Sequence, residues 1–124
     1  HGNQSVFRIE NVLHLQGKPV IHDKIIISEA MFPGLNQAAF TARATTIYGY
    51  YQAEFGVTIV EADERVRAEL IMADSARLLD LNESTPILRI DRVAHTFDRK
   101  PAEFRTSIVD TQSFDYVSRM REMK

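Results

Sequence analysis

The alternation of apolar and polar positions near the start of the chain predicts a β-hairpin. From Val6 to Leu15, apolar residues recur on one side, as in a strand with one buried face. The turn is expected at Gln16-Gly17-Lys18, because glycine adopts the backbone angles that tight turns require. Residues Pro19 to Ser28 then run back as the partner strand. Its run Ile25-Ile26-Ile27 is β-branched and apolar on both faces, which indicates burial.

A second strand–turn–strand unit lies near the other end of the chain and repeats the first. Its turn is expected at Asp98-Arg99-Lys100, and Pro19 matches Pro101 after an insertion in that turn. Before the turn, the pairs that match at one constant offset are Arg8 and Arg89, Ile9 and Ile90, Glu10 and Asp91, Val12 and Val93, and His14 and His95. Because internal repeats fix an architecture, the sequence predicts one sheet with approximate two-fold symmetry. We expect a ligand pocket at the seam between the copies.

The segment between the hairpins predicts an amphipathic helix from Thr45 to Phe55. Thr45 or Thr46 can cap its start, and Gly56 stands where a helix normally ends. The apolar positions that recur every four residues and form its core-facing stripe are Ile47, Tyr51 and Phe55. Gly49 costs about 1 kcal/mol relative to alanine inside a helix, so its presence indicates close packing there.

A long charged strand is expected from Val57 to Leu70, followed by a short helix from Ser75 to Leu81 with Asp74 as its cap. The residues expected to face inward from this helix are Ala76, Leu78, Leu79 and Leu81. Residues 82–86 form a turn cluster, and Ser113 to Met120 are expected to form a final helical turn.

Composition limits the classes of function. The chain has 124 residues, of which 44% are hydrophobic and 26% charged, as expected for one globular domain. Its net charge of −2 provides no basic field, so the chain alone is not expected to bind nucleic acid. No apolar run approaches the roughly 18 to 20 residues that span a bilayer, and no signal peptide is visible. We therefore expect a cytoplasmic protein, with which the lack of cysteine agrees.

The sequence carries no motif of common enzymes or metal sites. Without cysteine there is no thiol catalysis or thiolate metal site, and no G-x-S-x-G sequence or phosphate-binding glycine loop occurs. The four histidines show neither H-x-x-x-H nor H-E-x-x-H spacing. We therefore expect no catalytic residues, no metal and no cofactor.

Several motifs, in order, resemble those of a known family. They are R-I-x-x-V with G-K-P in the first hairpin, T-T-I-Y before a helix that ends in F-G, A-D-S-A-R-L-L-D-L, P-I-L-R-I-D-R, and K-P-A-E-F-R-T-S-I-V-D. Together they cover most of the chain. This set resembles the effector-sensing (UTRA) domain of GntR-type bacterial transcription regulators of the HutC subfamily.

The resemblance implies an α+β, chorismate-lyase-like fold, in which helices pack on a mainly antiparallel sheet of duplicated hairpins. It implies an allosteric domain, 1–124, that binds a small-molecule effector, forms a homodimer, and controls DNA binding by an upstream winged helix-turn-helix domain. The second hairpin is preceded by a strand and a helix, whereas nothing precedes the first. We therefore expect that the chain lacks an equivalent first strand–helix element, as well as the DNA-binding domain.

The resemblance also suggests where the effector binds. The family's pocket carboxylates fall on Asp23 and Glu103, and its hydroxyl-plus-aromatic pair falls on Thr46 and Tyr48. Neighbours on the same strand faces join these. The candidate effector-binding residues are Asn11, Leu13, Asp23, Thr46, Tyr48, Arg92, Glu103, Arg105 and Ser107. Members that sense sugar phosphates carry R-x-R where this chain has Asn11 and Leu13, so we expect an organic acid, an amino-acid derivative or an unphosphorylated sugar.

Purely structural roles for these residues, and other functions for the fold, are alternatives to this hypothesis. Arg92 and Arg105 are also consistent with surface ion pairs to Asp91, Glu103 or Glu69, and Tyr48 is consistent with a core position. The fold would also suit a lyase acting on chorismate, or a dimerisation module that has lost its ligand. We favour the non-enzymatic effector-binding domain, because the ordered motifs match the regulators better.

Overall fold

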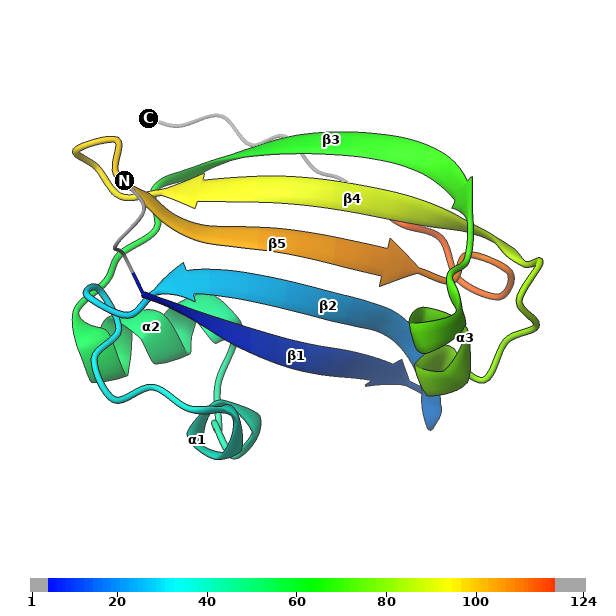
Figure 1. Cartoon of the computed structure of the whole chain (residues 1–124), viewed down its shortest axis with the longest axis horizontal. Helices are drawn as coiled ribbons and strands as arrows, with labels where there is room; N and C mark the ends of the chain where they lie inside the picture. The colour runs from blue at the N-terminus through cyan, green and yellow to red at the C-terminus, as the bar shows by residue number, and fades with distance from the viewer. Residues whose placement is uncertain (1–4, 118–124) are drawn as a thin grey trace.

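The computed structural model describes residues 5–117 and consists of one five-stranded antiparallel sheet with three short helices (Figure 1). The strand order is β1-β2-β5-β4-β3. The strands are β1 (Val6–Leu15), β2 (Lys18–Ser28), β3 (Glu61–Leu70), β4 (Pro86–His95) and β5 (Pro101–Val109). The helices are α1 (Gln37–Thr41), α2 (Ile47–Phe55) and α3 (Ala73–Leu79). Both predicted hairpins and the expected α+β class are confirmed.

The strand register shows the two-fold symmetry expected from the repeat. At the seam between β2 and β5, Lys24 pairs with Thr106, and these two positions are equivalents in the repeat. The flanking pairs that exchange under the rotation are Asp23–Ser107 and Ile25–Arg105. Both hairpins also shift register at the equivalent place, after Leu13 in the first and after Ala94 in the second. The two copies are therefore related by a half-turn about the middle of the seam.

The helices cover opposite faces of the sheet: in Figure 1, α2 lies behind the strands and α3 lies in front of them at the other end. The core behind the sheet joins isoleucines of the first hairpin to aromatic residues of the helical segment; it includes Ile9, Ile25, Ile27, Phe32, Phe40, Tyr50 and Tyr51. The smaller core in front contains Ile71, Ala76, Leu79, Ile87 and Ile108. Since strand side chains alternate between faces, β1 contributes Ile9 to the core behind the sheet and Val12 to the edge of the smaller core in front.

The cap residues of α2 and the glycine of the first hairpin turn act as predicted. The hydroxyl of Thr46 accepts a hydrogen bond from the backbone N–H of Gly49 at the start of α2, and Gly56 ends the helix with a φ of 66°. In the first hairpin turn, Gly17 has a φ of 77°. Both glycines occupy the left-handed region, which side chains with a Cβ rarely adopt.

The free edge of β1 is protected at one position by a side chain that imitates a neighbouring strand. The amide of Gln37 in α1 accepts a hydrogen bond from the backbone N–H of Glu10 (2.8 Å) and donates one to its carbonyl oxygen (2.8 Å). Helix α1 was not expected from the sequence; the side chain of Asn36 caps it by accepting from Ala39 N at 2.9 Å. Covering an edge in this way reduces pairing with other chains.

Three expectations about the second half of the chain are wrong in detail. The long charged strand begins at Glu61, not at Val57, because β4, which it pairs with, ends at His95. Helix α3 spans Ala73–Leu79 and its N-cap is Met72, whereas Asp74 lies within its first turn. These differences shift boundaries but not the order of the elements.

Two further expectations fail locally. Leu78 is 39% exposed and does not face the core, because α3 is too short to bury more than one stripe. Ser113 and Phe114 lie in a bend and residues 115–117 have no regular structure, so this part of the expected helical turn is wrong; the rest of it lies outside the described residues. Within residues 5–117, no helix is long and apolar enough to cross a membrane.

Candidate functional site

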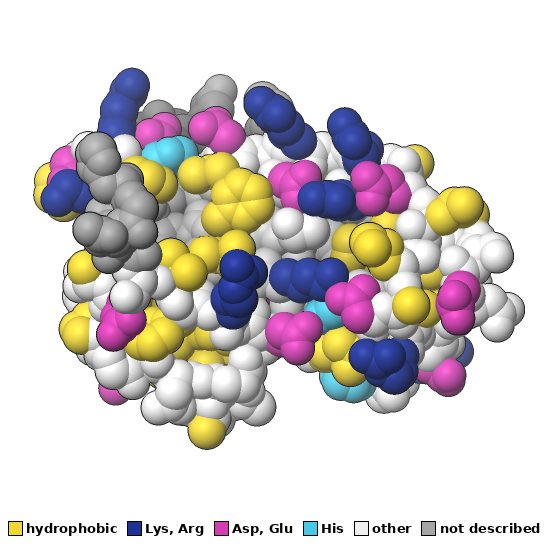
Figure 2. All heavy atoms as spheres, in the orientation of Figure 1, with side chains coloured by type: hydrophobic (Ala, Val, Ile, Leu, Met, Phe, Trp, Pro, Cys, Tyr) yellow, Lys and Arg dark blue, Asp and Glu magenta, His cyan; other side chains and the backbone are white. Residues whose placement is uncertain are grey.

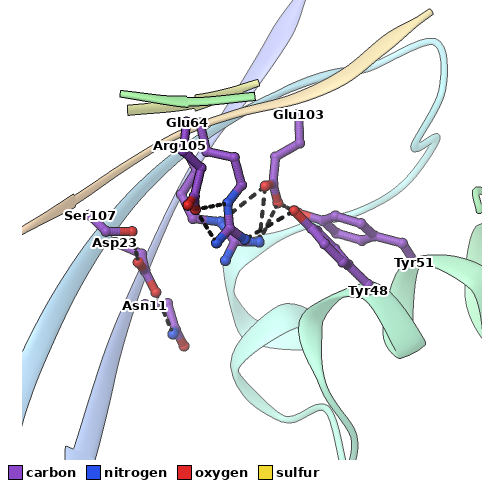
Figure 3. A network of polar contacts seen from close by, with 9 residues as sticks. Asn11, Asp23, Tyr48, Tyr51, Glu64, Glu103, Arg105 and Ser107 are labelled. Atoms are coloured by element: carbon purple, nitrogen blue, oxygen red, sulfur yellow. Dashed lines mark hydrogen bonds and ion pairs between the residues drawn. The ribbon is translucent and has the colours of Figure 1, made fainter. Parts of the chain in front are cut away.

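A network of polar side chains lies over the seam, on the face that α2 covers (Figure 3). It is unusual for the interior side of a sheet, where polar groups cost free energy unless they find partners. The strands contribute alternate residues that point to the same face, and α2 contributes two tyrosines. The members are Asn11, Asp23, Tyr48, Tyr51, Glu64, Arg92, Glu103, Arg105 and Ser107.

One half of the network centres on Asp23, which is 6% exposed. Its two carboxylate oxygens accept hydrogen bonds from Ser107 Oγ (2.6 Å) and Asn11 Nδ2 (3.0 Å). The oxygen of the Asn11 amide in turn accepts from Arg43 Nη2 at 3.2 Å. The Asn11 amide thus links, by two hydrogen bonds, a carboxylate in the sheet to a guanidinium in the connection between α1 and α2.

The other half centres on Glu103, which is only 2% exposed. Arg105 donates to both of its oxygens, from Nε at 3.0 Å and from Nη2 at 2.9 Å, and the Tyr51 hydroxyl donates to Oε2. Burial, followed by the charge of Glu103, raises the pKa of Tyr51, so the phenol keeps its proton. A carboxylate with three donors is well compensated, as a buried charge must be.

Arg92 and Tyr48 close the network on the side of β3. Arg92 donates from Nε to Glu64 at 2.7 Å and from Nη1 to the Tyr48 hydroxyl at 3.2 Å. Burial acts to lower the pKa of Arg92, but the hydrogen bonds with Tyr48 and Glu64 outweigh it and raise that pKa. The guanidinium of Arg105 lies 5.3 Å from the centre of the Tyr48 ring, within the range of a cation–π contact.

Charges in and beside the network balance. Glu64 contacts Arg92 and Glu103 contacts Arg105, whereas Asp23 is linked to Arg43 only through the Asn11 amide. Burial acts to lower the pKa of Arg105, but the charge of Glu103 and the hydrogen bonds to it, with smaller contributions from Tyr48 and Asp23, together raise that pKa. Such an arrangement presents donors and acceptors in alternation, so it can exchange internal partners for those of a polar ligand with charges of both signs.

The structure brings together seven of the nine candidate residues. They are Asn11, Asp23, Tyr48, Arg92, Glu103, Arg105 and Ser107. Leu13 lies on the same face but is 42% exposed and belongs to neither half. Thr46 is exposed and serves as the cap of α2. Both remain predictions as ligand contacts.

The surface ion-pair interpretation of the arginines holds only in part. Arg105 does pair with Glu103, but in the interior, and the partner of Arg92 is Glu64 rather than Asp91. The sequence did not point to Arg43, Tyr51 or Glu64 as members. For Tyr51 a signal existed, since a tyrosine in a core-facing stripe needs an acceptor for its hydroxyl.

On the opposite face, His22 is buried and links β1 and β2 to α3. Its Nδ1 lies 2.8 Å from Ser75 Oγ, and its Nε2 lies 2.9 Å from a carboxylate oxygen of Glu10. This contact docks the helix onto the sheet. In the part of the chain that the structure describes, no three residues among His, Asp and Glu are grouped to hold a metal ion.

Comparison with known proteins identifies the family. The family model for the UTRA domain matches residues 2–115. The fold also matches the crystal structure of the ligand-binding domain of a protein assigned to the GntR family of transcriptional regulators, from Bordetella bronchiseptica. That match has 30% identity and a TM-score of 0.88, and it covers 94% of this chain and 74% of the other. The chain belongs to the UTRA domain family.

Other solved structures share the fold of this UTRA domain. The effector-binding domain of the Bacillus subtilis trehalose repressor is 22% identical, with a TM-score of 0.76, and the match covers all (100%) of this chain and 84% of that one. PhnF from Mycobacterium smegmatis is 22% identical with a TM-score of 0.81; 95% of this UTRA domain matches 51% of that chain. No curated protein matches the sequence. The expected chorismate-lyase-like fold is thus confirmed.

Proposed function

We propose that this UTRA domain binds a small-molecule effector in a GntR-type regulator of the HutC subfamily. The observation that carries the proposal is the match of the UTRA model to residues 2–115, nearly the whole chain. In the parent regulator, an N-terminal winged helix-turn-helix domain outside this chain would bind DNA. The domain itself would be a cytoplasmic homodimer that lacks catalytic activity, and its net charge of −2 does not favour direct contact with DNA.

The effector would lie over the seam and bind to both hairpins. Its polar groups would replace internal hydrogen bonds of Asp23, Arg92 and Arg105, each of which already has a partner of opposite polarity. A ligand with both donors and acceptors suits this lining, such as an organic acid, an amino-acid derivative or an unphosphorylated sugar. Buried hydrogen-bonding groups discriminate strongly against ligands that leave them unpaired.

Regulation would follow from differential affinity. A ligand that contacts β1–β2 and β4–β5 together favours one relative arrangement of the two hairpins over another. If the dimer and the attached DNA-binding domains differ between these arrangements, a coupling of about 1–3 kcal/mol changes operator affinity by 5–150-fold. No covalent chemistry is required at the site.

A thermal-shift screen of this domain over organic acids, amino acids and sugars tests the proposal. A compound that binds the folded state raises the melting temperature as its concentration rises above its Kd. Asp23→Asn should reduce the shift, because it removes a charged acceptor at the centre of the site, whereas Glu29→Gln on the exposed loop should not. If no compound of the panel raises the melting temperature, a structural dimerisation module without a ligand is favoured. Formation of 4-hydroxybenzoate from chorismate would instead reveal an enzyme.

A further inference from the structure

A cavity of about 530 Å³ adjoins the polar network at the open edge of β1. In the space-filling view, the lower outline of the molecule is indented between the lobe that contains α1 and the lobe that contains α3 (Figure 2). The cavity is lined by Glu10, Asn11, Val12, His14, Thr41, Arg43, Thr45 and Leu78. Asn11 therefore belongs both to this cavity and to the network centred on Asp23.

Arg43 is the cation of this cavity, and its guanidinium is only partly satisfied. Nη1 donates to the carbonyl oxygen of Phe40 at 3.0 Å, and Nη2 donates to Asn11 Oδ1 at 3.2 Å. The guanidinium carbon lies 4.5 Å from the centre of the Phe40 ring, which fixes the plane of the group. The Nε–H of Arg43 is buried and has no hydrogen-bond partner among residues 5–117.

Among residues 5–117, every other arginine that is buried or half-buried is paired with a carboxylate. Arg89 lies near Asp91, Arg92 near Glu64, and Arg105 near Glu103. Within the described ranges, no carboxylate oxygen lies at ion-pair distance from Arg43, whose partners are neutral oxygens.

Glu10, which also lines the cavity, is engaged elsewhere. Its carboxylate is bound to Nε2 of the buried His22 at 2.9 Å, on the other face of the sheet. Arg43 therefore lines the cavity with a planar guanidinium whose buried Nε–H has no hydrogen-bond partner in the described part of the chain. A guanidinium with a free donor is well suited to bind an oxyanion, which can accept two parallel hydrogen bonds from Nε and Nη2 on the same edge of the group.

We propose that Arg43 holds an oxyanion of the effector, so that the ligand of this domain carries a carboxylate or a phosphate group. The oxyanion accepts from Nε and takes the place of Asn11 Oδ1 on Nη2. The Asn11 amide loses its bond to Arg43 but remains bonded to Asp23 through Nδ2, so binding at Arg43 is coupled to the hydrogen bonds at the seam. This inference rests on the proposed function and changes the expected ligand classes: it excludes neutral sugars as the natural effector and adds phosphorylated ligands, for which Arg43 would take the place of the missing R-x-R pair.

The test follows the Nε–Hε signals of the arginines by NMR during separate titrations with succinate, inorganic phosphate and the neutral analogue succinamide. The Arg43 signal is assigned by its loss in Arg43→Lys. We expect it to move to saturation with succinate or phosphate and to stay in place with succinamide; the stronger of the two anions distinguishes a carboxylate from a phosphate. A signal that stays unchanged with both anions overturns the proposal.

Matched variants separate this site from general electrostatics. Arg43→Gln should weaken anion binding by about tenfold or more, as expected for loss of hydrogen bonds to a charged group. Arg65→Gln, the same change on the exposed strand β3 at the other edge of the sheet, should leave it unchanged. Equal weakening in both variants would overturn the proposal. Circular dichroism checks that each variant is folded, and Arg43→Lys supplies a second variant that retains the charge.

The same variants distinguish failure of this inference from failure of the proposed function. If a neutral sugar stabilises wild type and Arg43→Gln equally in the thermal-shift screen, effector binding stands and the oxyanion site is refuted. If inorganic phosphate moves the Arg43 signal while no organic acid, amino acid or sugar of the screen stabilises the domain, the oxyanion site stands and the effector function fails.

Discussion

Replacing Glu103 by glutamine should destabilise the domain strongly. The side chain of Glu103 is fully buried (0% exposed) and is bound twice by Arg105, which is itself 9% exposed. Glu103→Gln keeps the size of the side chain but leaves the Arg105 cation buried without its counter-charge. Removing one partner of a buried pair typically costs about 3–5 kcal/mol. The nearby carboxylate of Asp23 compensates in part, so we expect about 3 kcal/mol.

Urea denaturation followed by circular dichroism measures this change. For a domain of this size, a loss of about 3 kcal/mol corresponds to a fall of roughly 10 °C in Tm. The matched control is Glu69→Gln, since Glu69 pairs with Arg89 at 3.7 Å but its side chain is 29% exposed. A pair of this kind is worth less than about 1 kcal/mol. Equal losses in the two variants would refute our view of Glu103 as a buried counter-ion.

A double variant separates charge burial from packing. Arg105→Met alone leaves the Glu103 carboxylate with only the Tyr51 hydroxyl as a donor, and it should also cost about 3 kcal/mol. Combining Glu103→Gln with Arg105→Met removes both charges and should recover a large part of the loss, because neither desolvated ion remains. Additive losses in the double variant would contradict the coupling.

Three smaller effects can be tested in the same way. Gly49→Ala should not give the gain of about 1 kcal/mol usual in a helix, because its Cβ would come within 2.9 Å of the capping Thr46 hydroxyl; a gain in Tm would contradict this. Ser75→Ala should cost about 1–3 kcal/mol in urea unfolding, since it leaves Nδ1 of buried His22 unpaired. The hydrogen bond from Lys24 lowers the pKa of Asp74. The contribution of this pair to the free energy of unfolding is therefore present above a pH of about 4, and it is lost as the pH falls through the lowered pKa of the folded state. Asp74→Asn should therefore cost at most about 0.5 kcal/mol at neutral pH, because the pair is half exposed, and nothing in strong acid.

The parts of the fold with strong local signals were predictable from the sequence. Alternating residues and the turn glycine Gly17 located the first hairpin, and the repeat located the second and predicted the symmetric register about Lys24 and Thr106. Thr46 and Gly56 bounded α2, because capping chemistry is local. The face of α3 was not predictable to the residue, since a helix of seven residues has too few turns for its period to identify one stripe.

The candidate site was predictable only where strand parity applies. Glu103 and Arg105 are two residues apart on one strand, so their common face followed from the pattern. Arg43 lies in an irregular connection, where no periodicity indicates the direction of a side chain. The acceptor of the Tyr51 hydroxyl could not be predicted either, because 52 residues separate it from Glu103 and only the packing of α2 on the sheet brings them together.

The half-turn that relates the two hairpins preserves their backbone but not their chemistry. Rotation about the seam carries Asp23 onto Arg105 and Asn11 onto Arg92, so an anion and a neutral amide are superimposed on two cations. A molecule laid across the midline thus meets Asp23 and Asn11 on one side and Arg105 and Arg92 on the other. Of its two opposite orientations only one matches, and a backbone built from two similar halves can therefore distinguish the head of a metabolite from its tail.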